Sequence, residues 1–186
     1  MEAHGGYLCR LDSLSPAQLI SLAREALASD QESAEGCSIQ VSAVLPKRVV
    51  RLAFDAPHTY GRRGARWYQT HHALARLLSL HRQVHVHAYV LDPDCFEEVA
   101  TYGSGRRVGG DRVDYDELEL CDEEAAFDDQ AFVRAKDQWP LGHLAQILGV
   151  SRDCLEMLPR ARSYLLNLDG TGPELAMSDL LEAQLP

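Results

Sequence analysis

The chain has 186 residues, of which 46% are hydrophobic, and its formal net charge at pH 7 is −10. This length fits one domain, or one domain with a helical appendage, and the hydrophobic content suffices for a sizeable core. No apolar run approaches the roughly 18 residues of a membrane-spanning helix, and residues 1–13 lack the basic start and apolar stretch of a signal peptide. We therefore expect a cytoplasmic protein that has no membrane partner.

The cysteines indicate a reduced protein. There are five of them, an odd number, and they are widely spaced with no C-x-x-C pair. This pattern is not typical of a disulfide framework or of a zinc site. It also gives no reason to expect a bound cofactor.

Residues 7–28 predict a strand followed by a helix. Tyr7, Cys9 and Leu11 alternate with Leu8 and Arg10, which is the period of a strand. Ser15 suits the N-cap of the helix, Pro16 suits its first position, and Gln18 completes a capping box. A stripe of leucines and alanines then marks the side of the helix that faces the core.

The next predicted elements are two strands, a helix and another strand. The two strands lie over residues 37–56 and flank a turn at Pro46 and Lys47. The helix covers residues 65–82, and the following strand covers residues 84–93.

The order of these elements predicts an α+β fold. Strand, helix, strand, strand, helix, strand is the order of the ferredoxin-like fold, in which two helices cover one face of an antiparallel sheet. We therefore predict a ferredoxin-like βαββαβ core over residues 1–100. His85, His87 and Tyr89 on its last strand point to the face that the helices leave open, where a partner can bind.

A second segment follows this core. Residues 92–103 predict a short helix, because Asp92 and Pro93 suit its start. A glycine-arginine loop and an acidic segment then occupy residues 101–129. Within them, alternating side chains predict an edge strand over residues 111–120. Its carboxylates would deter pairing with another sheet.

Residues 130–186 predict a helical segment with a candidate last strand over residues 162–170, packed with the core as one domain. Within this segment, residues 141–160 resemble a helix-turn-helix with a glycine at the turn. Its second helix would present Ser151 and Arg152 to DNA. Two carboxylates lie beside them and the chain is acidic overall, so a structural helix pair is favoured over DNA binding.

Charge is distributed unevenly along the chain. Residues 111–129 hold ten acids and one arginine, whereas residues 56–91 hold no acid, five arginines and six of the eight histidines. We expect the early acids to pair internally and the later acids to attract a protein partner with a basic surface. The expected partner-binding acids are Asp122, Glu123, Glu124, Asp128 and Asp129.

The glycines around Arg106 and Arg107 indicate a candidate anion site, in which backbone N–H groups and two guanidinium groups would hold a phosphate. The stretch lacks the P-loop and dinucleotide-binding motifs. A turn that leads into a hairpin also explains the glycines, and we favour the turn.

The sequence offers little for metal binding or catalysis. His85 and His87 project from one side of a strand, but no cysteine lies near them to complete a zinc site. The chain has no nucleophile-elbow motif and no paired-carboxylate or metalloprotease motif. We therefore expect no metal ion and no catalytic residue.

These observations favour a non-catalytic binding module, such as an inhibitor, an immunity-type protein or an adaptor. It would engage a macromolecular partner through the acidic segment, the open sheet face or both. One alternative is a helix-turn-helix regulator that uses residues 141–160, although a nucleic-acid partner is less favoured than a protein. The other is a small enzyme that acts on an anionic or phosphorylated ligand near Arg106 and Arg107.

Overall fold

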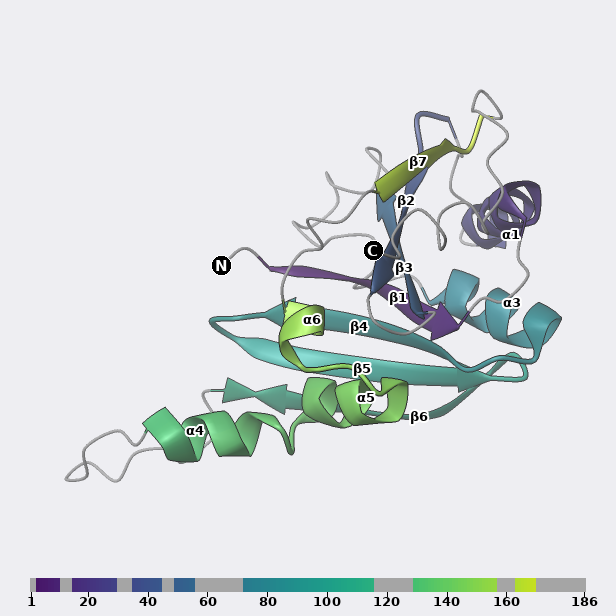
Figure 1. The fold of residues 1–186 in the computed structure, drawn as a ribbon. Helices are drawn as coiled ribbons and strands as arrows, with labels where there is room; N and C mark the ends of the chain where they lie inside the picture. Colours follow the sequence, from purple (N-terminus) through teal and green to yellow (C-terminus); the bar gives the residue numbers. More distant parts are fainter. Residues whose placement is uncertain are drawn as a thin grey trace.

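Seven strands form one antiparallel sheet in the order β6-β5-β4-β1-β3-β2-β7 (Figure 1). A computed structural model describes residues 3–10, 15–29, 35–44, 49–55, 72–115, 129–156 and 163–169 of the chain. Its strands are β1 (His4–Arg10), β2 (Ser38–Val44), β3 (Val49–Asp55), β4 (Val86–Asp92), β5 (Phe96–Gly103), β6 (Arg106–Asp114) and β7 (Ser163–Asn167). Its described helices are α1 (Pro16–Ser29), α3 (Ala73–Arg82), α4 (Asp129–Lys136), α5 (Pro140–Leu148) and α6 (Asp153–Glu156).

The α+β class is confirmed, but the sheet is larger than expected. Its four central strands lie in the order β4-β1-β3-β2. β5 and β6 extend the sheet beyond β4, and β7 extends it beyond β2. The sheet thus takes strands from all three predicted segments. Helix α3 lies within the helix predicted over residues 65–82, of which residues 65–71 fall outside the described residues.

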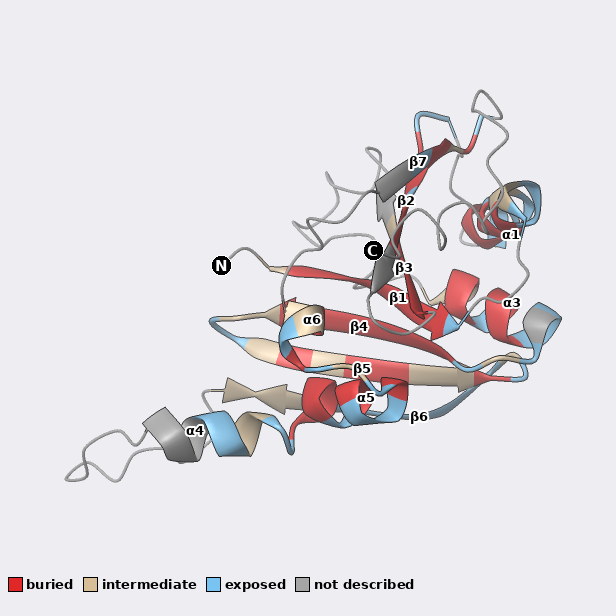
Figure 2. Cartoon of the chain, in the orientation of Figure 1, coloured by how far each residue is buried: buried red, intermediate tan, exposed pale blue. Residues whose placement is uncertain are grey.

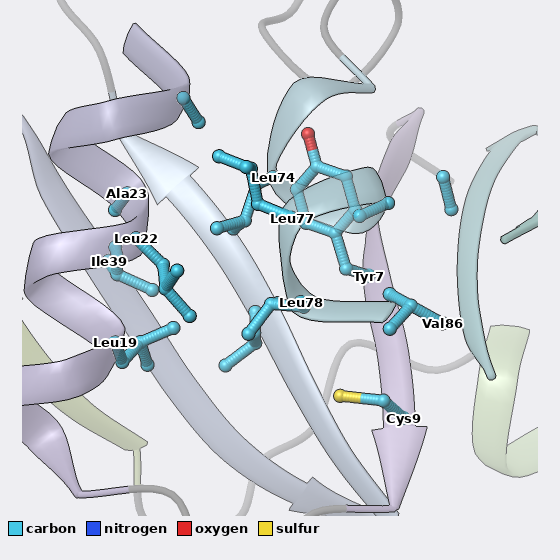
Figure 3. Close-up of a cluster of buried hydrophobic side chains, with 14 of the residues drawn as sticks. Tyr7, Cys9, Leu19, Leu22, Ala23, Ile39, Leu74, Leu77, Leu78 and Val86 are labelled. Atoms are coloured by element: carbon cyan, nitrogen blue, oxygen red, sulfur yellow. The ribbon is translucent and has the colours of Figure 1, made fainter. Parts of the chain in front are cut away.

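Helices α1 and α3 cover one face of the sheet (Figures 1 and 3). Their leucines pack with Tyr7, Ile39 and Val86, which point from the sheet toward the helices. Burial of a large aliphatic or aromatic side chain stabilises a fold by roughly 1.5–3 kcal/mol. This layer is the core that the alternation in the sequence predicted.

Helices α5 and α6 cover part of the other face, which we expected to be open. Leu141, Leu144 and Leu155 of this segment pack with Leu8 and Tyr89 of the sheet. Strands β1 and β4 are therefore buried on both faces over most of their length (Figure 2). The expectation of helices on one face is wrong because both sides of these strands carry large apolar groups, which need a second covering layer.

Residues 96–103 form strand β5, so the helix predicted over residues 92–103 is wrong. Asp92 accepts a hydrogen bond from the backbone N–H of Asp94, at 3.2 Å, and this bond belongs to a turn. Every residue from Phe96 to Tyr102 pairs with β4 in an antiparallel ladder. An Asp-Pro pair starts helices and turns alike, and pairing with β4 decides the outcome because it satisfies the backbone of the whole strand.

The glycine-arginine stretch is a β-hairpin, which confirms the turn interpretation. Ser104 and Gly105 both have positive φ, at 50° and 76°, as a two-residue hairpin turn requires. Strand β6 forms one edge of the sheet, and the predicted edge strand is confirmed as far as Asp114, where β6 ends. A register shift interrupts the β5–β6 ladder, and this irregularity opposes pairing with another sheet.

The remaining described elements, α4, α5, α6 and β7, lie where helices and a last strand were predicted. Helix α5 ends at Gly149, which has φ 70° and donates its backbone N–H to the carbonyl of Gln146 at 3.1 Å. Helix α6 has only four residues. Residues 157–160 of the helix-turn-helix-like stretch lie outside the described residues.

Candidate functional site

A buried ion pair fixes helix α5 on the sheet. The fully buried carboxylate of Glu97, on β5, accepts hydrogen bonds from both terminal nitrogens of Arg152. It also accepts from the backbone N–H of Leu141 at 2.9 Å and from the Tyr115 hydroxyl at 3.1 Å. Because Leu141 lies in the first turn of α5, the carboxylate faces the positive end of the helix dipole.

Arg152, a DNA-binding candidate, is also held from its other side. Its Nε donates to Glu156 at 2.6 Å, and its Nη1 donates to the carbonyl of Lys136. Burial opposes the ionisation of Glu156, but hydrogen bonds from Lys136 and Arg152 outweigh it and lower the pKa of this carboxyl. The arginine is therefore an internal cross-link, whereas Ser151, the other DNA-binding candidate, is exposed with its hydroxyl 3.1 Å from the Cys154 sulfur.

Two hollows lie between α5 and the sheet, and they share Ile147 as a wall. One has a volume of about 210 Å³ and lies between α5 and strands β5 and β6. The other has a volume of about 250 Å³ and lies between the end of α5 and residues of β1 and β4. We name this surface the α5 cleft. It is lined by Arg10, Val84, His85, His87, Val99, Thr101, Gly110, Asp111, Pro140, His143, Leu144, Ile147 and Leu148.

Ile147 is the apolar group that the cleft presents to solvent. Its side chain is 65% exposed, although α5 buries its other large apolar residues. It lies off the buried stripe formed by Leu141, Leu144 and Leu148. A single exposed apolar side chain is ordinary on a protein surface. Ile147 differs from the others because a hollow lies on each side of it, which gives an apolar group of another molecule room to pack against it.

A histidine–threonine pair connects the two hollows. His87 lines the second hollow and Thr101 lines the first, with the His87 Nδ1 2.9 Å from the Thr101 Oγ1. Burial, and then the neighbouring ring of His85, lower the pKa of His87 to about 4. His87 is therefore neutral at pH 7 and offers hydrogen bonds rather than a positive charge.

We expect acidification to destabilise the protein because of His87. Its folded-state pKa of about 4 lies below the ordinary value of 6.5, so its neutral form stabilises the fold above pH 6.5. This contribution is lost as the pH falls from 6.5 toward 4. Between pH 7 and pH 5, the free energy of unfolding should fall by about 2 kcal/mol, which urea denaturation at the two pH values will measure.

Two variants separate His87 from the other histidines. His87→Gln should remove most of this pH dependence, because no buried imidazole is then left to protonate at that position. His85→Gln changes an exposed neighbour and should leave most of the dependence in place. The same pH dependence in wild type and His87→Gln would contradict the assignment.

The structure brings together two of the three residues that were predicted to share a partner-binding face. His85 and His87 both line the α5 cleft, with ring centroids 6.4 Å apart. Tyr89 is buried, and its hydroxyl accepts a hydrogen bond from the Nε of Arg51 at 2.7 Å. Burial raises the pKa of Tyr89 although the charge of Arg51 acts against it. Tyr89 thus belongs to the core beneath the second helical layer.

The other predicted site residues lie apart from the cleft or outside the described residues. Arg106 and Arg107 are exposed at the start of β6, and the Nε of Arg107 donates to the Gly109 carbonyl at 3.4 Å. Asp129 is the first residue of α4, and its side chain is not among those described. The acidic residues outside the described ranges are Asp122, Glu123, Glu124 and Asp128. An acidic partner-binding surface therefore stays a prediction.

Of the cleft residues, sequence reasoning predicted only His85 and His87, and Arg10, Thr101 and Ile147 are the most informative of those that it missed. Arg10 ends β1 and donates to the Leu148 carbonyl at 3.2 Å, at the negative end of the α5 dipole. No local pattern connects Arg10 or Thr101 with α5. Ile147 did carry a signal, because it is an apolar residue outside the helical stripe of its own segment.

Within the described residues, no group of three or more histidines, cysteines and acids could hold a metal ion. No hydrogen bond joins His87 to a carboxylate in the described part of the chain, so its pair with Thr101 lacks the orienting group of a nucleophilic triad. None of the described helices is long and apolar enough to cross a membrane. No protein-family model matches the sequence, and no curated protein or solved structure matches it either.

Proposed function

We propose that the protein is a non-catalytic binding module, of the inhibitor or adaptor kind, which engages a protein partner through the α5 cleft. The observation that carries this proposal is Ile147, an exposed apolar side chain between two hollows. Small-molecule pockets usually measure roughly 300–1,000 Å³. The hollows measure about 210 and 250 Å³, so each suits a side chain of a partner better than a free ligand.

The fixed position of α5 supports a binding function. Arg10 binds the carbonyl of Leu148 at the end of the helix, and Glu97 binds the backbone N–H of Leu141 at its start. A surface that is already ordered loses less conformational entropy when a partner binds. The cleft therefore has the preorganisation that a specific interaction surface needs.

We also propose that the strands β4-β1-β3-β2, with helices α1 and α3, are a ferredoxin-like unit. The order of these strands and the position of both helices on one face support this assignment. Strands β5, β6 and β7 and helices α5 and α6 are then additions to the unit. The α5 cleft lies where these additions meet its second face.

The two alternative functions have weaker support. The guanidinium group of Arg152 is engaged by Glu97 and Glu156, so it has no free donor face for a DNA base or phosphate. An enzyme would need a positioned acid, base or nucleophile, and the pair of His87 and Thr101 lacks an orienting carboxylate among the described residues. A protein partner is the hypothesis that the cleft favours.

Replacement of Ile147 by serine should weaken partner binding and leave the protein folded. The probes are short peptides selected on the wild-type protein from a random phage-displayed library. We expect them to bind Ile147→Ser at least about tenfold more weakly, because loss of a buried apolar anchor costs more than about 1.4 kcal/mol. Isothermal titration measures the affinities, and stability should change by less than about 0.5 kcal/mol at this exposed site.

Val133→Ser is the matched control. Val133 is 62% exposed on α4 and lines neither hollow, so its replacement should leave peptide affinity unchanged. If the selected peptides bind Ile147→Ser as tightly as wild type, the α5 cleft is not the binding surface. An equal loss in both variants would also count against the cleft.

A further inference from the structure

The α5 cleft opens at His85 toward the tip of the β5–β6 hairpin. His85 lines the second hollow, and a Cβ added at Gly103 would lie 2.9 Å from its ring and 3.6 Å from Val108. Val108 is 58% exposed, and the tip of β6 is drawn exposed in Figure 2. An exposed aliphatic side chain therefore continues the cleft onto the hairpin.

The same hairpin tip lies against helix α3 (Figure 1). The backbone N–H of Gly105, in the turn, donates to the Ser79 hydroxyl of α3 at 3.1 Å. A Cβ at Gly105 would lie 3.2 Å from the Cβ of Leu80, which is 54% exposed. Two aliphatic side chains, Leu80 and Val108, thus flank the turn at the surface.

Three arginines lie on the two elements that carry these aliphatic groups. Arg106 and Arg107 begin β6, and Arg76 lies on α3, all three exposed. Arg76 and Arg107 both lie near Tyr102, because the charge of each acts on the hydroxyl group of this residue. Burial raises the pKa of Tyr102, and the charges of Arg107 and Arg76 act against that rise.

This surface is basic although the protein as a whole is acidic. Residues 72–91 and 99–110, which form it, contain no aspartate or glutamate. Glu98, whose charge also acts on Tyr102, pairs with Arg112 at 3.6 Å. Within the described ranges, no carboxylate pairs with the three arginines. We name this set of residues the hairpin-tip surface: Arg76, Leu80, His85, Arg106, Arg107 and Val108.

We propose that the protein partner presents an acidic segment with aliphatic side chains, which lies along the hairpin-tip surface and into the α5 cleft. This inference rests on the proposed function. Carboxylates of the segment meet the arginines, and its aliphatic groups pack on Leu80, Val108 and Ile147. Charge complementarity speeds association and supplies specificity, whereas apolar burial supplies affinity.

An acidic protein segment fits this surface better than a nucleic acid does. Leu80 and Val108 have no counterpart in a phosphate backbone. A nucleic acid also extends its charge far beyond the three arginines, where the net charge of −10 repels it. A short acidic segment stays within about one Debye length, roughly 8–10 Å, of the arginines.

Binding of fluorescein-labelled peptides, measured by anisotropy, tests this inference. The probe is a peptide in which glutamates alternate with leucines, and its comparator has glutamine in place of each glutamate. At low salt, the acidic peptide should bind at least about tenfold more tightly than the glutamine peptide. This advantage should vanish at about 1 M salt, where the Debye length is about 3 Å.

Variants of β6 assign the charge effect to individual residues. Arg106→Gln combined with Arg107→Gln should weaken binding of the acidic peptide about tenfold and leave the glutamine peptide unaffected. The matched control is Arg112→Gln on the same strand, because Asp114 and Glu98 already pair with that arginine. The control should change the affinity by less than about twofold.

Each outcome decides between the inference and the function on which it rests. If both peptides bind equally and only Ile147→Ser weakens them, the binding module stands and the acidic partner is wrong. If neither designed peptide binds, the acidic partner is wrong. If, in addition, no peptide can be selected on the wild-type protein, the binding module is wrong as well. If duplex DNA of equal charge binds more tightly than the acidic peptide and loses binding in the β6 double variant, the surface binds phosphates and the inference is wrong.

Discussion

Replacement of Glu97 by alanine should lower the free energy of unfolding by about 3–5 kcal/mol, because it leaves the guanidinium group of Arg152 buried without its main partner. The backbone N–H of Leu141 and the Tyr115 hydroxyl lose their acceptor as well. The start of helix α5 would then lose its hydrogen bond to β5. Urea denaturation of wild type and variant measures the loss.

The neighbouring carboxylate provides the control. Glu98 is partly exposed and pairs with the exposed Arg112, so Glu98→Ala should cost less than about 1 kcal/mol. The double variant Glu97→Met, Arg152→Met removes both charges and should recover the part of the lost stability that comes from the unpaired guanidinium group. Equal losses in Glu97→Ala and Glu98→Ala would contradict the view that the buried ion pair fixes α5.

Gly6→Ala should be the second strongly destabilising change, with a loss of about 3 kcal/mol. Gly6 lies in the central strand β1 with φ +152°, and a Cβ there would lie 2.5 Å from the carbonyl oxygen of Leu52 on β3. The backbone of β1 would have to move away from β3 and strain the ladder. Thermal and urea denaturation should both report the loss.

Gly109→Ala tests whether the effect at Gly6 is specific. A Cβ at Gly109, on the edge strand β6, would have no atom within 4 Å. Stability should therefore change by less than about 0.5 kcal/mol. If Gly6→Ala is as stable as Gly109→Ala, the close approach of β1 and β3 does not limit the side chain at this position.

Local patterns in the sequence predict most helices and strands, because caps and alternation are short-range signals. The predicted capping box is present: Ser15 and Gln18 exchange two hydrogen bonds, each 3.2 Å long. The error at residues 92–103 has a local cause too, since Asp92 and Pro93 suit both a helix and a turn. Pairing with the neighbouring strand β4 decided the outcome, and a local sequence pattern carries no information about which strands pair.

The candidate site was less predictable, since long-range contacts assemble it. His85 and His87 share a side of one strand, and this property is visible in the sequence. Thr101 meets His87 only because β5 pairs with β4, and Arg10 meets Leu148 across 138 residues of chain. The second helical layer was missed for the same reason, since no pattern tells which helix covers an apolar strand face.

The central position of β1 affects how the chain emerges during synthesis. β1 precedes both of its neighbours by a long interval, because Tyr7 pairs with Leu52 of β3 and Leu8 pairs with His87 of β4. At translation rates of roughly 5–20 residues per second, β4 leaves the ribosome several seconds after β1. Strands β2 and β3 follow one another and can pair in the meantime. The nascent strand that becomes the middle of the sheet is thus the one that waits longest for its first partner, and in that interval chaperones and other chains can bind it.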